Sequence, residues 1–226
     1  MRDAVKTKSL KRSMRGLGAC MAVLGASFLL SAFAAARPVS YPGGWTGIQN
    51  NNANFSALNI HYSPTAKDAV GLYIEQNWTV DATFYGAQYT RLLGRWNGTG
   101  SQANLYFNLG AGVSQPFNSG ALDAAGFIGL NADWETRRWF ASYTARADRL
   151  GSDQNFRQNA RFGLAPYIGD FGDLHTWFMV QLDHIPENGI PLTATPLLRF
   201  FKNVHLIEFG YTPARERFLA NYTIRF

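Results

Sequence analysis

The last ten residues of the chain, Arg217 to Phe226, alternate between apolar and polar side chains. Successive side chains of a β-strand point to opposite faces, so this pattern predicts a strand with one apolar and one polar face. The apolar face carries Phe218, Ala220, Tyr222, Ile224 and Phe226. The polar face carries Arg217, Asn221, Thr223 and Arg225, and Leu219 is the one side chain that interrupts it.

A terminal strand that ends on phenylalanine, with an apolar residue at nearly every second position, resembles the last strand of outer-membrane β-barrel proteins of Gram-negative bacteria. In that class the last strand is the signal recognised by the barrel-assembly machinery. The resemblance implies that Phe218, Tyr222, Ile224 and Phe226 form the assembly signal and face lipid. The last strand of a soluble β-sandwich is the alternative that this stretch leaves open.

The rest of the chain repeats the alternation in segments separated by turn-forming residues. No stretch of ten residues has a convincing helical period. Twelve strands are predicted, or ten if the first two are omitted, at residues 44–50, 56–62, 69–78, 83–94, 102–113, 123–134, 138–147, 157–168, 174–184, 192–201, 204–212 and 216–226. Roughly ten residues suit a tilted strand that crosses a bilayer.

Composition agrees with a barrel wall. Charged residues make up 16% of the chain and aromatic residues 15%, yet the mean hydropathy is slightly negative. A wall in which lipid-facing and lumen-facing residues alternate gives this combination. We therefore predict an all-β fold, a closed antiparallel up-and-down transmembrane β-barrel over residues 37–226, located in the outer membrane.

The first 36 residues have the parts of a secretory signal peptide. Six of the 21 basic residues and one of the 15 acidic residues fall in this leader, and an apolar run from Gly16 to Phe33 precedes small residues at Ala34–Ala36. We expect cleavage before Arg37; an uncleaved anchor is the alternative. The remaining 15 basic and 14 acidic residues nearly balance, so no nucleic-acid partner is expected. Cys20, the single cysteine, precedes most of the apolar run and is not expected to carry lipid.

The connections between strands predict the topology. With both termini in the periplasm, the longer connections Ser114–Leu122, Asp148–Phe156 and Ile185–Pro191 face outside, and the short ones face the periplasm. Arg95–Ser101 is a periplasmic exception. Pro166 and Pro196 fall inside predicted strands, where each removes a hydrogen-bond donor.

Charged residues on the polar faces of the predicted strands are expected to line the lumen of the barrel. Glu75, Arg146, Arg157, Asp183 and Arg217 are expected near the outer mouth, with Arg225 at the periplasmic end. Three more are expected at mid-depth, namely Arg161, Arg199 and Glu208. Asp133 and Arg138 are expected to face each other across a periplasmic hairpin. Such side chains either interlock into a plug or leave a charged constriction that selects solutes.

No HExxH, GxSxG or P-loop motif is present. The four histidines are scattered, so neither a metal site nor a cofactor is expected. His61 beside Ser63, or His205, is the only candidate for a lipid-acting enzyme, and structural roles are favoured.

Several short segments are also similar to an uncharacterised family of exported proteobacterial proteins. This resemblance implies no activity. The segments are Tyr41–Trp45, His61–Thr65, Ser101–Tyr106, Trp134–Arg138 and Ala165–Gly169.

The sequence thus favours a small channel or porin-like barrel with an arginine-rich lumen that passes small solutes or ions, with anions preferred. The alternatives are a plugged structural or interaction barrel of an envelope or efflux assembly, and an outer-leaflet lipid hydrolase or acyltransferase. The expected partners are outer-membrane lipid and the barrel-assembly machinery.

Overall fold

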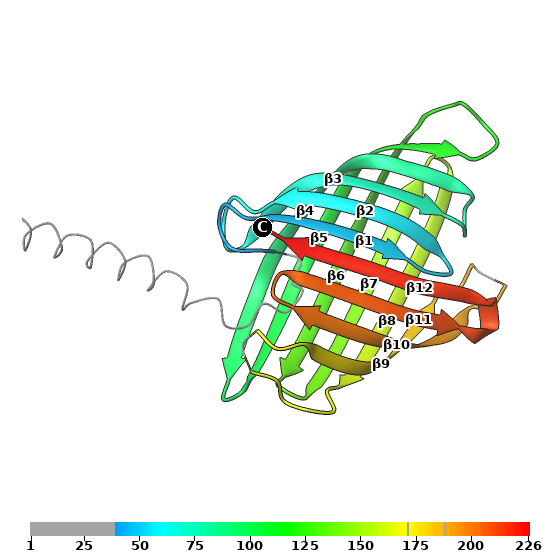
Figure 1. Cartoon of the computed structure of the whole chain (residues 1–226). Helices are drawn as coiled ribbons and strands as arrows, with labels where there is room; N and C mark the ends of the chain where they lie inside the picture. Colours follow the sequence, from blue (N-terminus) through cyan, green and yellow to red (C-terminus); the bar gives the residue numbers. More distant parts are fainter. Residues whose placement is uncertain (1–38, 171, 188) are drawn as a thin grey trace, which may run out of the picture. The chain divides into compact units, whose positions relative to one another are not determined.

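A computed structural model describes residues 39–170, 172–187 and 189–226. The twelve strands of this region form one closed antiparallel barrel, in which each strand pairs with its sequence neighbours and β12 pairs with β1 (Figure 1). The predicted fold class is confirmed, with twelve strands rather than ten. The predicted signal peptide, residues 1–36, lies outside the described residues.

The strands closely follow the predicted segments. Their bounds are β1 (Trp45–Asn51), β2 (Phe55–Tyr62), β3 (Asp68–Asn77), β4 (Ala82–Gly98), β5 (Ser101–Pro116), β6 (Asp123–Thr136), β7 (Trp139–Leu150), β8 (Asp153–Leu164), β9 (His175–His184), β10 (Leu192–Lys202), β11 (His205–Thr212) and β12 (Arg217–Arg225). A short 3-10 turn, η1 (Pro213–Arg215), precedes β12. Among the described residues, no helix is long and apolar enough to cross a membrane.

The barrel closes where its two terminal strands meet. β1 and β12 pair from Thr46 opposite Arg225 to Asn51 opposite Ala220. The amide of Trp45 donates to the carbonyl of Phe226 at 2.6 Å, and the amide of Phe226 donates back at 3.0 Å. Closure leaves no open sheet edge around this ring of strands.

Two predicted connections are wrong because the strands continue into tight turns. Asp148–Phe156 is not a long loop: β7 runs to Leu150 and β8 begins at Asp153. Gly151, at φ +66°, supplies the left-handed backbone of that turn. Arg95–Ser101 likewise shrinks to two residues between β4 and β5, one of which is Gly100 at φ +74°.

The two prolines are accommodated differently. β8 ends at Leu164, so Pro166 lies in the ten-residue connection to β9, which is longer than expected for the periplasmic side. Pro196 does lie inside β10. The ladder between β10 and β11 ends at Leu197, one residue short of Pro196, while the ladder with β9 continues past it. Proline lacks a backbone N–H group, and Pro196 lies just beyond the end of the β10–β11 ladder.

The wall is taller on one side than on the other. β4 to β8 contain 12 to 17 residues each. β1, β2, β11 and β12 contain only 7 to 9. A bulge between Leu92 and Gly94 shifts the register of the β4–β5 hairpin.

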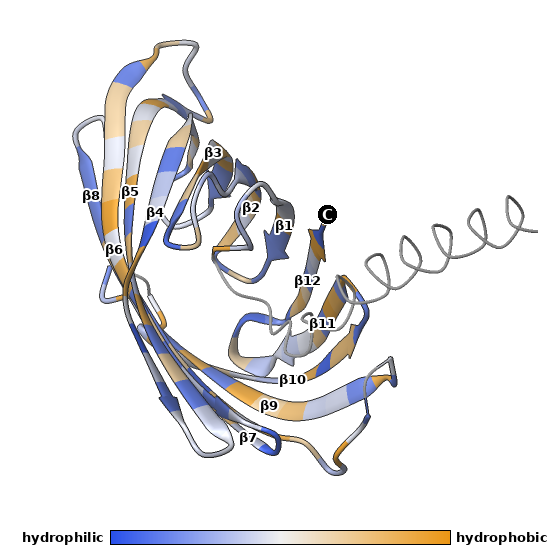
Figure 2. Cartoon of the chain, turned by 90° about the vertical axis from the view of Figure 1, so that its left-hand side faces the viewer, coloured by the Kyte–Doolittle hydropathy of each residue, from blue (hydrophilic) through white to orange (hydrophobic). Residues whose placement is uncertain are grey.

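The outward face of the wall is apolar and exposed, and apolar and polar residues alternate along the strands in Figure 2. The exposed apolar side chains include Leu72, Ile128, Phe162, Phe178 and Phe209. On β12, Phe218 is 77% exposed and Phe226 62% exposed, which gives the predicted assembly signal an outward direction. Leu219 points the other way and is buried with Met179 and Leu197, which explains its place in the sequence pattern.

Tryptophans at strand ends are mostly exposed, as interfacial aromatic residues would be. Trp78, Trp96, Trp134 and Trp139 lie on the surface, each more than 40% exposed. Trp177 differs, because it packs edge-on against Phe140 at a ring separation of 6.4 Å.

Candidate functional site in the barrel lumen

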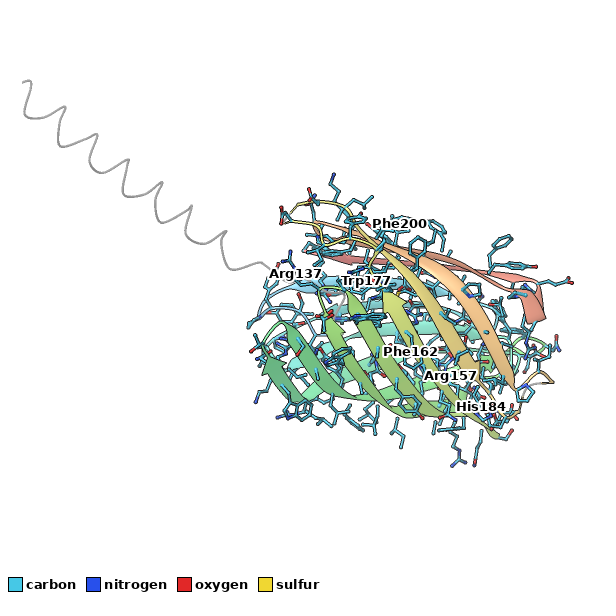
Figure 3. The ribbon with its side chains drawn as sticks, turned by 90° about the horizontal axis from the view of Figure 1, so that it is seen from below. Arg137, Arg157, Phe162, Trp177, His184 and Phe200 are labelled. Carbon is cyan, nitrogen blue, oxygen red and sulfur yellow. The ribbon has the colours of Figure 1, made fainter. Side chains whose placement is uncertain are left out.

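The first cluster of lumen charges surrounds Glu75, whose side chain is fully buried. Arg157 on β8 donates to its carboxylate at 2.5 Å, and Arg146 on β7 lies 3.4 Å away. The hydroxyl of Tyr73 donates to the same carboxylate at 2.5 Å. The structure thus brings together side chains of three strands, and Figure 3 labels Arg157 among them.

Asp148 completes this cluster and balances its charge. Arg146 Nε donates to Asp148 Oδ1 at 2.6 Å, and Arg157 Nε lies 3.5 Å from Asp148 Oδ2. Both guanidinium groups also stack on aromatic rings: Arg146 lies 3.5 Å from the centre of Phe127 and Arg157 lies 4.4 Å from that of Phe55. Two arginines and two carboxylates therefore form a neutral, aromatic-lined cluster.

The second cluster surrounds Glu208 on β11. Arg199 Nε donates to Glu208 Oε1 at 2.7 Å, and Arg161 donates to Oε2 at 3.1 Å. Asn221 on β12 donates to the same carboxylate at 2.7 Å. Arg161 also donates to Gln181 Oε1 at 2.6 Å. These bonds join β8 to β12 across the inner face of the wall.

Gln181 extends the second cluster to Asp183, donating to its two carboxylate oxygens at 2.8 and 2.7 Å. Apolar side chains pack against the inner wall in the same part of the barrel. They are Met179, Leu197 and Leu219, with Phe140 and Trp177 against them.

The start of the described chain fills a third part of the lumen. Val39 is 3% exposed and belongs to an apolar cluster with Ala69, Leu92 and Tyr106. The amide of Ser40 donates to Ser63 Oγ at 3.1 Å, and the amide of Gly43 donates to the Ser63 carbonyl at 2.8 Å. The segment is thereby fixed beside the end of β2, at the end of the barrel where β1 begins and β12 ends.

The predicted pairing of Asp133 with Arg138 is wrong. The β6–β7 register places Asp133 opposite Ser142, because Arg138 lies in the turn rather than on the strand. Asp133 instead accepts a bond from Asn104 at 2.7 Å, and Asn104 accepts one from Arg95 at 2.7 Å. Arg138 is exposed and donates to a backbone carbonyl of the β8–β9 connection.

The two remaining lumen candidates lie at opposite ends of β12. Arg217 stands opposite Thr212 and is exposed at the outer end, outside both charge clusters. Arg225 stands opposite Thr46 at the other end and is half-buried.

The histidines have structural surroundings. His61 is buried, and its Nδ1 lies 3.0 Å from Asn59 Oδ1. Ser63 is engaged by the amide of Ser40, as described above. His205 stacks on Tyr222, with Nδ1 2.8 Å from the tyrosine hydroxyl. Within the described residues, no group of three or more His, Cys, Asp or Glu side chains is placed to hold a metal ion.

Sequence reasoning missed four contributors to the lumen. The sequence predicts Asp148 in a loop, although it lies two residues after Arg146 on β7 and its side chain therefore points to the same face of the strand. Tyr73 and Phe127 are not among the predicted lumen residues, although both are buried inside. Their parity was the available signal. Val39 precedes the first strand and has no periodic pattern to identify it.

In the lumen clusters, the charged side chains bind one another. In the first cluster, both guanidinium groups are bound by buried carboxylates, and a buried pair needs such bonds to offset its desolvation. Opposite strands are tied together, and little net charge remains for a solute.

No protein-family model and no curated protein matches this sequence. One solved structure similar to the fold comes from a study of the mechanism behind the in-meso crystallization of membrane proteins, with 12% sequence identity, a TM-score of 0.44, and coverage of 81% of this chain and 83% of that chain.

Proposed function

We propose that this chain is an outer-membrane β-barrel whose lumen is filled by its own side chains, and that it serves as a structural or interaction barrel of the cell envelope. The observation that carries the proposal is the burial of the inward side chains. Glu75 and Phe84 have no exposed surface, and Gln181 and Leu219 are 1% exposed. Lumen side chains of an open aqueous channel would be wetted instead.

The outward face supports the membrane location. A continuous apolar surface of this kind is unusual on a soluble protein, where large exposed patches mark binding or membrane contact. The leader at residues 1–36 provides for export, and the outward aromatic residues of β12 provide for recognition by the assembly machinery.

The β4–β5 hairpin supports a role in interaction. β3 pairs with β4 only as far as Arg91, so the following residues of β4 extend beyond β3. Leu93 and Trp96 of this extension are 53% and 59% exposed. With both termini in the periplasm, the extension would face periplasmic proteins.

A narrow anion pathway is the second candidate. Arg161 and Arg199 share the carboxylate of Glu208, and their side chains keep 19% and 12% of their surface exposed. Water therefore reaches the two arginines of the second cluster, which share the carboxylate of Glu208, while the Asp183 carboxylate is bound by Gln181 instead.

Planar-bilayer recording of the purified protein separates the two. The plugged barrel is expected to give no stable conductance steps, because buried ion pairs occupy the lumen. Reproducible ohmic steps would overturn that proposal. Anion-selective reversal potentials under a salt gradient would then support the pathway, and cation selectivity would exclude it.

A further inference from the structure

The outer wall contains an apolar groove that faces away from the lumen. Its volume is about 1000 Å³, and it crosses β6 to β11. Trp134, Trp139, Phe162 and Phe178 form its sides. Pockets for small molecules fall in the range of about 300–1,000 Å³.

The groove is hollow because short and long side chains alternate across neighbouring strands. One cross-strand row runs from Trp134 through Ala141 and Phe162 towards Pro196. Ala141 and Pro196 reach less far from the wall than the aromatic side chains beside them. The resulting depression is long, apolar and open to the surroundings of the barrel.

Two arginines stand at one end of this groove. Arg137 and Arg138 form the turn between Thr136 and Trp139. They directly precede Trp139 in the chain, and Trp139 is one of the two tryptophans that form the sides of the groove. Figure 3 shows Arg137 at one end of the barrel and His184 at the opposite end. Tryptophans of this kind mark the headgroup level of a bilayer, which places the arginines just beyond it.

Both arginines keep donors available. Arg137 Nη2 donates to the Gly169 carbonyl at 3.2 Å, and Arg138 Nε donates to the Ala165 carbonyl at 3.3 Å. Each guanidinium has five N–H donors, so these bonds orient the groups without exhausting them. Neither arginine forms a salt bridge within the described part of the chain.

The facing loop also carries two carboxylates, Asp170 and Asp173. Asp173 accepts a bond from the amide of Asp170 at 3.0 Å. Among the described residues, neither carboxylate forms a salt bridge with Arg137 or Arg138, so both guanidinium groups remain available to a phosphate.

We propose that this groove binds an anionic phospholipid of the periplasmic leaflet, with an acyl chain along Ala141 and Pro196 and the phosphate at Arg137 and Arg138. Charge complementarity decides the headgroup: two cations at the end of an apolar groove fit a phosphate that carries net negative charge. The inference rests on the membrane-spanning role proposed above.

Native mass spectrometry of the detergent-extracted protein tests this site with phosphatidylglycerol and phosphatidylcholine as probes. Wild type is expected to retain phosphatidylglycerol over phosphatidylcholine by about twenty-five-fold, at about fivefold for each of the two arginines. The double variant Arg137→Gln/Arg138→Gln is expected to retain both lipids equally. Ala141→Phe fills the groove and is expected to lower retention of both.

Matched controls lie at the other end of the same strand. Arg149 and Ala147 are exposed on β7, so Arg149→Gln and Ala147→Phe are expected to leave lipid retention unchanged. Equal retention of the two lipids by wild type would overturn the proposal. So would a loss in the controls as large as in the groove variants, or unchanged retention in Ala141→Phe.

Insertion is scored separately, by heat-modifiable migration and protease protection in vesicles. A protein that fails to insert contradicts the proposed membrane role itself. A protein that inserts normally but shows no anionic preference contradicts only the lipid site.

Discussion

At the scale of single residues, Glu75 holds two arginines in the closed interior. Glu75→Gln removes the charge that binds Arg146 and Arg157, and leaves both guanidinium groups buried beside Tyr73. Breaking a buried pair by removing one partner costs about 3–5 kcal/mol. We expect the free energy of unfolding, measured by denaturant titration in lipid vesicles, to fall by about that amount.

Arg91→Gln is the control for this loss. Arg91 lies 3.2 Å from Asp68, and its side chain is 52% exposed. Exposed pairs contribute little, so the unfolding midpoint should not move. If both variants unfold at the same midpoint, the clusters are not what stabilises the barrel.

Gly110 leaves room for the aromatic residue beside the first cluster. A Cβ added there would lie 2.1 Å from the Phe127 ring. Because Phe127 is buried against Arg146, it has little freedom to retreat. Gly110→Ala should lower the free energy of unfolding by about 1–3 kcal/mol, the usual cost of overpacking.

Gly120→Ala is the matched substitution, since nothing lies within 4 Å of the Cβ it would add. Thermal melting of the two variants in the same micelle checks the comparison. A midpoint for Gly110→Ala equal to that of Gly120→Ala would show that Phe127 is mobile.

At the scale of elements, β12 carries the predicted assembly signal, and Phe218 and Phe226 of that signal lie on its exposed face. If the terminal aromatic residue is recognised as the resemblance implies, Phe226→Ser should lower the share of protein that reaches the outer membrane in heat-modifiable form. Phe209→Ser on β11 removes a phenylalanine of similar exposure, 57% against 62%, and should assemble normally. Equal defects would mean that general hydrophobicity, and not β12, guides assembly.

The alternation of side chains predicted the strands well, because one buried face and one lipid face fix each register. The predicted ends of the strands were wrong where the residues of a turn determine where a strand stops. Leu150-Gly-Ser-Asp153 reads as a loop from composition, yet a single left-handed glycine suffices to reverse the chain there. Because that strand end was predicted too early, Asp148 was placed in a loop and not among the lumen residues.

Within the lumen, the alternation of side chains predicted the inward position of Glu75, Arg157 and Glu208, but it failed for Arg138 and Arg217, which are exposed. It also left the partners of the inward charges undetermined. Glu75 and Arg157 are 82 residues apart, and their 2.5 Å contact depends on the tilt and closure of the whole barrel. The aromatic side chains that fill the lumen, Tyr73 and Phe127, could have been found only by counting their positions along the strand, because their apolar character alone also fits the outer wall.

At the scale of the whole molecule, the barrel has two distinguishable ends. Cys20 is the only cysteine in the sequence and lies in the predicted signal peptide, so single introduced cysteines would report topology without background once that segment is cleaved. Ser119→Cys, in the β5–β6 loop, should react with an impermeant maleimide on intact cells. Thr99→Cys, in the β4–β5 turn, should react only after the outer membrane is opened.

The reverse labelling pattern would place the β4–β5 turn outside the cell and the β5–β6 loop in the periplasm, which would exchange the outer and periplasmic ends of the barrel. Labelling of both sites on intact cells would indicate a leaky or unassembled barrel, which the heat-modifiable form on gels would reveal.

The unequal height of the wall has a consequence for the surrounding lipid. Seven residues of β1 reach only ~23 Å along the strand at ~3.3 Å per residue, and a tilt of ~40° reduces that span to ~18 Å. The apolar band of such barrels is usually ~25 Å tall, so acyl chains beside the β1–β12 junction must shorten or splay to cover it. Hydrophobic mismatch of this kind would draw the protein towards thin regions of membrane and make the junction the place where the bilayer is most easily deformed.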